Sequence, residues 1–309
     1  MSTSAVLAGV RAAWDHDLAH DLRRHPSALV ASTLLLLILF SAAFAPFLSP
    51  QNPYDLTQLS LNSAELPPAF AAGGTLPYLL GTDPQGRDVL SAILYGSRVS
   101  LLIGLAAVAL SATIGVVAGL LAGYHGGFLG NLIMRVGDTV LSLPTLLIAI
   151  LFNAIFRTLL PSDLREFLAP GILVLSIAAV SWVQYARLVR AATLVEANRE
   201  YVQAARIIGV GASRIMRRHI LPNIMTPVLV TATLNLGLAI LAEATLSFLG
   251  VGMPVNQPSL GTLIRTGNEY FFSGSWWVVL FPALQLCLII LSVNLVADWL
   301  RDAINPKLR

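Results

Sequence analysis

The chain has 309 residues, of which 56% are hydrophobic and 11% are charged, and its mean hydropathy is +0.76. Soluble domains carry roughly a quarter charged residues, so this composition excludes an ordinary soluble or disordered protein and indicates a chain embedded in lipid. The formal net charge of +3 and the isoelectric point near 9.3 could indicate nucleic-acid binding. The basic residues are instead distributed as in an oriented membrane protein.

Six stretches are long and apolar enough to cross a bilayer. A spanning helix needs about 20 residues, and a backbone in lipid must satisfy its own hydrogen bonds, which favours helices. The predicted spans are residues 28–47, 100–123, 137–156, 167–186, 224–249 and 276–297. We therefore expect an all-α membrane protein with a tail at 1–26 and one six-helix transmembrane domain at 27–309.

The loops between these spans differ in charge. Six crossings place both termini on the same side of the membrane. Fourteen of the 19 basic residues fall in the segments on that side and five on the other. The positive-inside rule therefore predicts that both termini are cytoplasmic.

Residues 1–26 are predicted to be a cytoplasmic amphipathic tail whose helix lies on the membrane surface. Its apolar residues recur at helical spacing: Leu7, Val10, Trp14 and Leu18. Its histidines are expected to be solvated rather than metal-bound: His16, His20 and His25. No metal site is predicted in the chain.

The sequence offers no catalytic motif. A Walker A loop needs a Gly-Lys pair, whereas the only lysine, Lys307, follows Pro306. HExxH and GxSxG motifs are also lacking, so we do not expect an enzyme.

The fifth predicted span contains Glu243, the only ionisable residue clearly inside a span. Charge inside a bilayer is costly, so a gradient-driven carrier that uses Glu243 is an alternative function. A simpler interpretation is that Glu243 is hydrogen-bonded within the bundle or faces a watery path. With Asn235 and Ser247 nearby, this span is predicted to line a translocation pathway.

The loop 187–223 is too charged for lipid but helical in pattern. Four residues form a predicted apolar stripe on its first helix: Tyr201, Ala204, Ala205 and Ile208. Gly209 and Gly211 are expected to end that helix, because glycine readily adopts a positive φ. A second short helix is expected from about Ser213 and to end before Pro222. Two helices around a glycine turn would form a compact docking protrusion.

A second informative segment precedes the second span. In LLGTDPQGRDVL, residues 79–90, Thr82 or Asp83 can cap a helix whose first turn contains Pro84. Arg87 and Asp88 are expected to pair locally, and an amphipathic elbow should follow at the outer interface.

These two segments resemble a known family. The stretch EYVQAARIIGVGASRIMRRHILPN, residues 200–223, resembles the EAA loop of permease subunits of binding-protein-dependent ABC importers. Gln203 stands where that family has its nominal glutamate. The resemblance implies contact with an ATPase subunit through the following residues: Glu200, Tyr201, Ala204, Ala205, Arg206, Gly209, Ala212, Leu221 and Pro222.

The segment 79–104 resembles the outer elbow of the C-type permease of the dipeptide, oligopeptide and nickel branch. The matching elbow residues are Gly81, Thr82, Asp83, Gly86, Arg87 and Asp88. The segments 122–147 and 242–252 and the C-terminal NPKLR are also similar to this branch, so the resemblance covers about residue 20 to the end.

This resemblance implies a type I importer permease in the bacterial cytoplasmic membrane. Its expected partners are a second homologous permease, two ABC ATPase subunits and an extracytoplasmic solute-binding protein. The ATPases would bind ATP and Mg²⁺, and this chain would bind no cofactor. Di- or oligopeptides are the expected substrate, with nickel chelates or other small solutes as alternatives.

Overall fold

The computed structural model describes residues 22–304 except 56 and 58, so the predicted helix of the tail and the NPKLR terminus lie outside the described residues. The described chain is helical and contains no strand, which confirms the predicted all-α fold. Its α-helices are α2 (Pro26–Ala43), α3 (Ala45–Leu48), α4 (Val89–His125), α5 (Gly127–Leu141), α6 (Thr145–Leu159), α7 (Ser162–Glu196), α8 (Glu200–Ile207), α9 (Ala212–Ile215), α10 (Leu221–Phe248), α11 (Leu260–Tyr270) and α12 (Trp277–Ile304).

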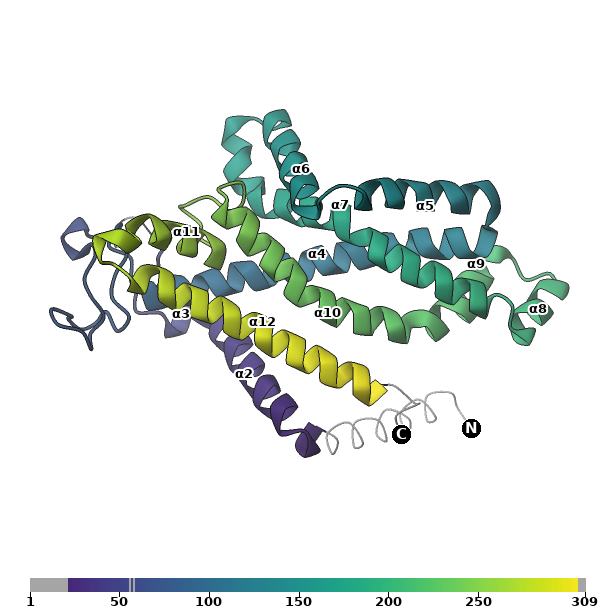
Figure 1. Ribbon diagram of the computed structural model, residues 1–309, viewed down its shortest axis with the longest axis horizontal. Coiled ribbons are helices and arrows are strands. Elements are labelled where there is room, and N and C mark those ends of the chain that lie inside the picture. The colour runs from purple at the N-terminus through teal and green to yellow at the C-terminus, as the bar shows by residue number, and fades with distance from the viewer. Residues whose placement is uncertain (1–21, 56, 58, 305–309) are drawn as a thin grey trace.

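The long helices α4, α7, α10 and α12 run along the length of the molecule (Figure 1). Helix α2 packs beside α12, and α5 and α6 lie on one side of the bundle. Helices α8 and α9 lie at one end, which we call the α8 end. Helices α3 and α11 and the segment 49–88 lie at the other, which we call the α11 end.

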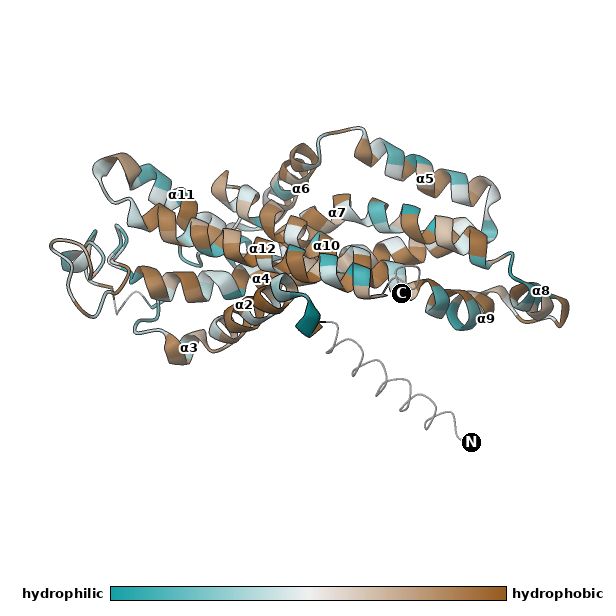
Figure 2. Ribbon diagram, turned by 60° about the horizontal axis from the view of Figure 1, so that its bottom comes forward, coloured by the Kyte–Doolittle hydropathy of each residue, from teal (hydrophilic) through white to brown (hydrophobic). Residues whose placement is uncertain are grey.

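Among the residues that the structure describes, five helices are long and apolar enough to cross a membrane, and a bent helix pair brings the number to six if it counts as one span. Hydrophobic residues run along α2, α4 and α12, whereas hydrophilic residues gather on α5, α8 and α9 (Figure 2). Large apolar side chains are exposed on the outside of the bundle, such as Leu36 and Leu37 on α2. Lipid is the solvent that accommodates such a surface.

The third predicted span, 137–156, is not one helix. Helices α5 and α6 meet at a bend of 96°. The break falls at Ser142–Pro144, where Pro144 precedes the first residue of α6. Proline lacks an N–H group and disfavours helical geometry at the residue before it, so a helix tends to end there. The stretch predicted as the third span is therefore a bent pair of helices rather than one continuous helix.

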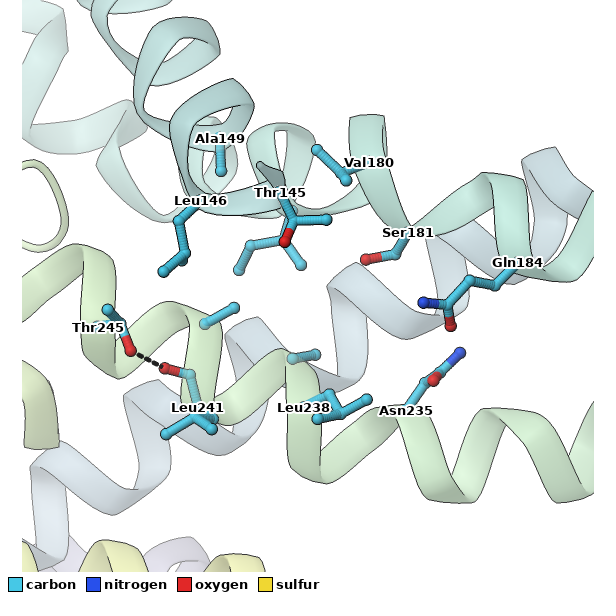
Figure 3. A pocket seen from close by; sticks show the side chains of 13 residues that line it. Thr145, Leu146, Ala149, Val180, Ser181, Gln184, Asn235, Leu238, Leu241 and Thr245 are labelled. Atoms are coloured by element: carbon cyan, nitrogen blue, oxygen red, sulfur yellow. Dashed lines mark hydrogen bonds between the residues drawn. The ribbon is translucent and has the colours of Figure 1, made fainter. Parts of the chain in front are cut away.

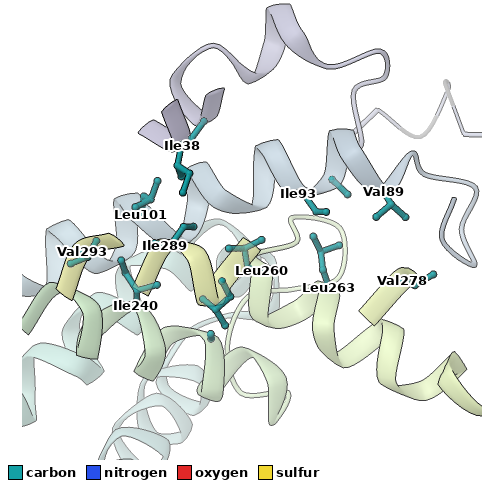
Figure 4. Close-up of a cluster of buried hydrophobic side chains, with 14 of the residues drawn as sticks. Ile38, Val89, Ile93, Leu101, Ile240, Leu260, Leu263, Val278, Ile289 and Val293 are labelled. Carbon is teal, nitrogen blue, oxygen red and sulfur yellow. The ribbon is translucent and has the colours of Figure 1, made fainter. Parts of the chain in front are cut away.

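Two expectations about element boundaries were wrong. Helix α4 is continuous from Val89, so there is no separate elbow before residue 100. The polar segment 253–275, expected to be an outer loop, contains α11, whose Leu260 and Leu263 are buried against the bundle. The cluster that buries them also includes side chains of α2, α4, α10 and α12 (Figure 4). This cluster fixes the α11 end of the bundle.

Helices α4 and α7 approach each other closely along a row of glycines. Gly115, Gly119 and Gly123 recur every four residues on α4 and face α7. A Cβ atom on Gly119 would lie 2.6 Å from the carbonyl oxygen of Ala186 and 2.7 Å from Cβ of Val189. Small residues at this spacing allow helices to pack backbone to backbone in a membrane. A similar approach joins α10 to α12, where a Cβ atom on Gly237 would lie 2.6 Å from Oδ1 of Asn294.

The glycine row makes a prediction about stability. Gly119→Leu should lower the free energy of unfolding by about 1–3 kcal/mol, the usual cost of overpacking a tight interface. Gly171→Leu is the matched control, because a Cβ atom at Gly171 would meet nothing within 4 Å. Thermal unfolding of both variants in detergent measures the difference. Equal melting temperatures for the two would contradict the packing argument.

Candidate functional site

The glycine turn after α8 forms as the sequence predicted. Gly209 has a φ of +80°, and its N–H donates to the carbonyl of Arg206 over 3.1 Å. The N–H of Val210 donates to the carbonyl of Ala205 over 3.0 Å. These two bonds form a Schellman motif, in which glycine supplies the left-handed residue. The turn fixes the direction in which the chain leaves α8.

The buried face of α8 differs from the predicted stripe. Val202 and Ala205, three residues apart, are buried in a cluster formed with α4, α7 and α10. Tyr201 and Ile208 are exposed, and Ile207 is 86% exposed. Of the predicted stripe, Tyr201, Ala204 and Ile208 are exposed and remain free to contact a partner, whereas Ala205 is buried. Val202 takes the central buried position because it lies one helical turn before Ala205.

The remainder of the docking protrusion differs from expectation in one respect. The second helix does not end before Pro222. A π-helical turn at Met216–Ile220 joins α9 to α10, so residues 212–248 form one helix. Leu221 and Pro222 directly follow the π-helical turn as the first residues of α10, and such an irregular turn can accommodate the missing N–H of a proline. We call residues 199–222 the coupling segment, after the role that the sequence resemblance implies.

Polar contacts tie the coupling segment to three long helices. The Tyr201 hydroxyl donates to Glu196 at the end of α7, and Asn223 Nδ2 donates to the Tyr201 oxygen over 2.7 Å. The Arg206 guanidinium lies 4.7 Å from the ring centroid of Tyr124, near the end of α4. Such a cation–π contact contributes about 0.5–1 kcal/mol when exposed. Movement of α8 is thereby linked to α4, α7 and α10.

Two other residues predicted to contact an ATPase lie at helix starts. Glu200 is the first residue of α8, and Ala212 is the first residue of α9.

The elbow residues form a buried clasp at the α11 end. Asp83 and Arg87 are an ion pair 2.6 Å apart, and Arg87 Nη1 also donates to the carbonyl of Val255 over 2.9 Å. The expected pair of Arg87 with Asp88 was wrong. Both paired side chains are fully buried, which makes excellent geometry necessary to offset their desolvation.

Other backbone contacts complete this clasp. Thr82 Oγ1 accepts from the Leu66 N–H over 2.8 Å, and the Trp277 indole donates to the Thr82 carbonyl over 3.0 Å. Gly81 and Gly86 have positive φ values, as their turns require. The clasp thus holds the segment 49–88 to α12 and to the loop before α11. Because the clasp is buried, we interpret its role as stabilising the fold.

Asp88 caps α4, in place of the expected Thr82 or Asp83. Its carboxylate accepts from the Ser91 N–H over 2.8 Å and from the Ser91 hydroxyl over 2.5 Å. Pro84 lies in the turn before the helix, so it is not in the first helical turn. Burial raises the pKa of the Asp88 carboxyl, against the lowering effect of the Ser91 hydrogen bonds. Because the folded chain then binds this proton more tightly than the unfolded chain, the contribution of Asp88 to stability falls as pH rises through its folded pKa.

A cap substitution tests this role. Asp88→Ala should lower the free energy of unfolding by about 1 kcal/mol, the usual effect of removing an N-cap. Asp88→Asn should keep most of the cap while removing the titration of this position. Thermal unfolding of both variants between pH 5 and pH 8 measures both effects. A destabilised Asp88→Asn protein that matches Asp88→Ala would contradict the assignment of the cap.

Glu243 lies at the centre of a buried hydrogen-bond network. The Ser100 hydroxyl of α4 and the Ser247 hydroxyl of α10 each donate to its carboxylate over 2.7 Å. The Ser100 oxygen accepts from the Leu260 N–H over 3.3 Å, and the Ser247 oxygen accepts from the Met253 N–H over 3.1 Å. Backbone amides can only donate, so both hydroxyl protons point to Glu243. The network holds the start of α11 and the loop before it against the bundle.

A cavity of about 280 Å³ lies between α6, α7 and α10 (Figure 3). Aliphatic side chains form most of its wall. Its polar side chains come from all three helices: Thr145, Ser181, Gln184, Asn235 and Thr245. Of the three residues predicted to line a pathway, Asn235 lies at this cavity. Glu243 and Ser247 are fully buried and do not line it.

Sequence reasoning missed the contributions of α4, α6 and α7 to these two sites. Ser100, Thr145, Ser181 and Gln184 are single polar residues within apolar helices. A polar residue inside a spanning helix usually faces the bundle or a cavity rather than lipid. That rule could have selected all four residues, although it could not have assigned them to different sites.

Comparison with known proteins identifies the family. Residues 115–309 match the profile described as binding-protein-dependent transport system inner membrane component. Residues 13–68 match the N-terminal TM domain of oligopeptide transport permease C. Together the two matches include most of the membrane helices.

Curated relatives are similar over almost the whole chain. The di/tripeptide transport system permease protein DppC of Pseudomonas aeruginosa (strain UCBPP-PA14) is 43% identical over 91% of this chain and 88% of its own length. The dipeptide transport system permease proteins DppC of Escherichia coli (strain K12) and Haemophilus influenzae (strain ATCC 51907 / DSM 11121 / KW20 / Rd) are 43% and 39% identical, over 94% and 93% of this chain and 92% of each relative. This chain is therefore a multi-pass inner-membrane protein, a C-type permease of the family of binding-protein-dependent ABC transport systems.

Proposed function

We propose that this chain forms half of the pathway by which an ATP-driven importer carries di- or oligopeptides across the inner membrane. The other half comes from a second homologous permease. A solute-binding protein delivers the peptide on the α11 side, and two ABC ATPases bind ATP and Mg²⁺ on the α8 side. The printed names of the relatives support peptides as the substrate. The chain itself performs no covalent chemistry.

The observation that carries this proposal is the path of one helix. Residues 212–248 run without a break from the coupling segment to the wall of the cavity. A packed helix moves as a body, so a displacement at the α8 end reaches the part of the cavity wall that α10 forms. The exposed Ile207 and Ile208 offer an apolar tip for a groove on an ATPase. ATP binding would draw the two ATPases together, move this tip and open the pathway toward the binding protein.

The orientation follows from the same assignment. The coupling segment must face the ATPases, so the α8 end is cytoplasmic, and both termini lie on that side. The basic residues of the coupling segment agree with the positive-inside rule: Arg199, Arg206, Arg214, Arg217 and Arg218.

Affinity purification of the tagged chain from its native membrane in mild detergent tests the assembly. We expect a second permease and Walker-motif ATPases to co-purify, in amounts that mass spectrometry can compare. The reconstituted complex should then take up labelled dipeptide only with ATP and binding protein. A folded chain that purifies alone would contradict the proposed assembly. Uptake of a nickel chelate in place of peptide would contradict the proposed substrate.

A gradient-driven carrier makes two different predictions. This chain alone should transport the solute, and Glu243→Gln should abolish that transport. The position of Glu243 favours the importer, because its carboxylate is buried in the network with Ser100 and Ser247 and does not line the cavity. Uptake by liposomes that contain only this chain distinguishes the two functions.

A further inference from the structure

The polar groups of the cavity are all uncharged. Gln184 of α7 and Asn235 of α10 point their carboxamide groups toward one another across it (Figure 3). The other polar positions are hydroxyls, and the Thr245 hydroxyl already donates to the carbonyl of Leu241 over 2.8 Å. None of the described residues that line the cavity is an acid or a base.

Asn235 has unused hydrogen-bonding capacity. Its Nδ2 atom is buried near the Tyr185 hydroxyl, but it makes no hydrogen bond of normal geometry to that hydroxyl or to any other residue that the structure describes. A buried amide without a partner is costly, at about 1–3 kcal/mol, so its presence in a pathway wall points to a partner that arrives with the substrate. A carbonyl oxygen is the group that would satisfy it. Every peptide supplies carbonyl oxygens, whatever its side chains.

Arg187, the charged residue of α7 nearest to Gln184, is already paired. Arg187 lies one helical turn beyond Gln184, toward the α8 end. Its Nη2 atom is 2.5 Å from Oδ1 of Asp138 on α5. The pair is about half exposed, so solvent screens what remains of its field. The charge of α7 nearest to the cavity is therefore compensated.

We infer that Gln184 and Asn235 form an amide subsite that hydrogen-bonds to the main-chain amide groups of the passing peptide, and that the uncharged wall makes passage through this half of the pathway insensitive to peptide side-chain charge. The inference rests on the proposed function and extends it to the chemistry of recognition. Weak, neutral hydrogen bonds suit a pathway, because a solute must leave each site as readily as it enters.

Introducing a charge at the subsite tests the inference. The reconstituted importer is supplied with binding protein and with alanyl-alanine, lysyl-alanine or glutamyl-alanine. Asn235→Asp and Gln184→Glu should each lower the ratio of glutamyl-alanine to alanyl-alanine uptake about fivefold or more relative to wild type, because a fixed negative charge repels the acidic peptide. The lysyl-alanine ratio should rise or stay constant. Because every protein uses the same binding protein, its own preference cancels in this comparison.

Two controls separate selectivity from misfolding. Asn131→Asp adds the same charge on the exposed surface of α5 and should leave the ratios unchanged. Gln184 is itself exposed, so Gln184→Glu should fold even if a buried charge at position 235 is not tolerated. Asn235→Ala should slow all three peptides by a similar factor, since it removes a hydrogen bond common to them.

The outcomes distinguish the inference from the proposed function. Suppose that wild type carries the peptides and that Gln184→Glu shows the same uptake ratios of charged peptide to alanyl-alanine as Asn131→Asp. The amide subsite is then overturned, and the proposed peptide importer stands. A wild-type complex that already discriminates strongly by side-chain charge at saturating binding protein also overturns the uncharged pathway. If wild type carries none of the three peptides, the proposed function fails and the inference fails with it.

Discussion

Gly209→Pro is expected to uncouple ATP hydrolysis from uptake while leaving membrane insertion intact. Gly209 has a φ of +80°, whereas proline is restricted to about −65° and has no N–H to donate to Arg206. The Schellman turn would be lost, and an incompatible proline costs about 3 kcal/mol or more. Ile207 and Ile208 would then leave the position in which α8 presents them. Uptake should fall at least about tenfold, whereas basal ATP hydrolysis by the complex should persist.

The chain offers a matched control two residues away. Gly211 has a φ of −61°, a value that proline adopts without strain. Gly211→Pro should therefore retain most of the uptake. Gly209→Asn should also retain activity, because asparagine tolerates the left-handed region better than other residues with a side chain. Uptake by Gly211→Pro as low as that of Gly209→Pro would show that the turn tolerates no proline at all and would contradict the conformational argument.

Glu243→Ala is expected to release α11 from the bundle. It removes the acceptor of two buried hydroxyls, and a buried donor left unsatisfied costs about 1–3 kcal/mol, so the free energy of unfolding should fall by about 2–6 kcal/mol. Ser100 and Ser247 would keep their bonds from Leu260 and Met253 but lose the partner of their own protons. Thermal unfolding and limited proteolysis of the segment 250–259 measure the loss.

Glu243→Gln distinguishes a carboxylate that stabilises the fold from one that takes part directly in transport. Its amide offers one carbonyl in place of two acceptor oxygens, so about half of the destabilisation should remain. A gradient-driven carrier predicts the opposite pattern, with normal stability and no transport. Glu269→Ala is the control, because its exposed pair with Arg265, 3.5 Å apart, should contribute only about 0–1 kcal/mol. Normal thermal unfolding of Glu243→Ala would contradict the network.

The features that the sequence predicted well depend on local chemistry. Long apolar stretches such as 28–47 and 276–297 became α2 and α12 because hydropathy alone requires helices in lipid. The turn at Gly209 was predicted because glycine accepts a positive φ wherever it lies. Asn235 was singled out because it is a polar residue in an apolar helix, and it lies at the cavity.

The features that were missed depend on tertiary contacts. Asp83 looked like a helix cap, yet it pairs with Arg87, and Asp88 takes the cap in its place. Local sequence could not rank these two acids, because the choice depends on Gln51, whose side chain accepts the Asp88 N–H over 2.7 Å. Helix α11 was missed because its segment is polar and rich in proline, and its helix depends on burial of Leu260 and Leu263.

The helix of residues 212–248 has a mechanical consequence. It approaches α12 closely at Gly237, beside Asn294. At 1.5 Å per residue, about 37 Å of helix lies on the coupling side of that point and about 16 Å on the other. If the helix pivots at this contact, its two ends move in opposite directions, and the end at residue 248 moves less than half as far as the end at residue 212. An inward movement of the helix at the α8 end would then accompany a smaller outward movement at the α11 end.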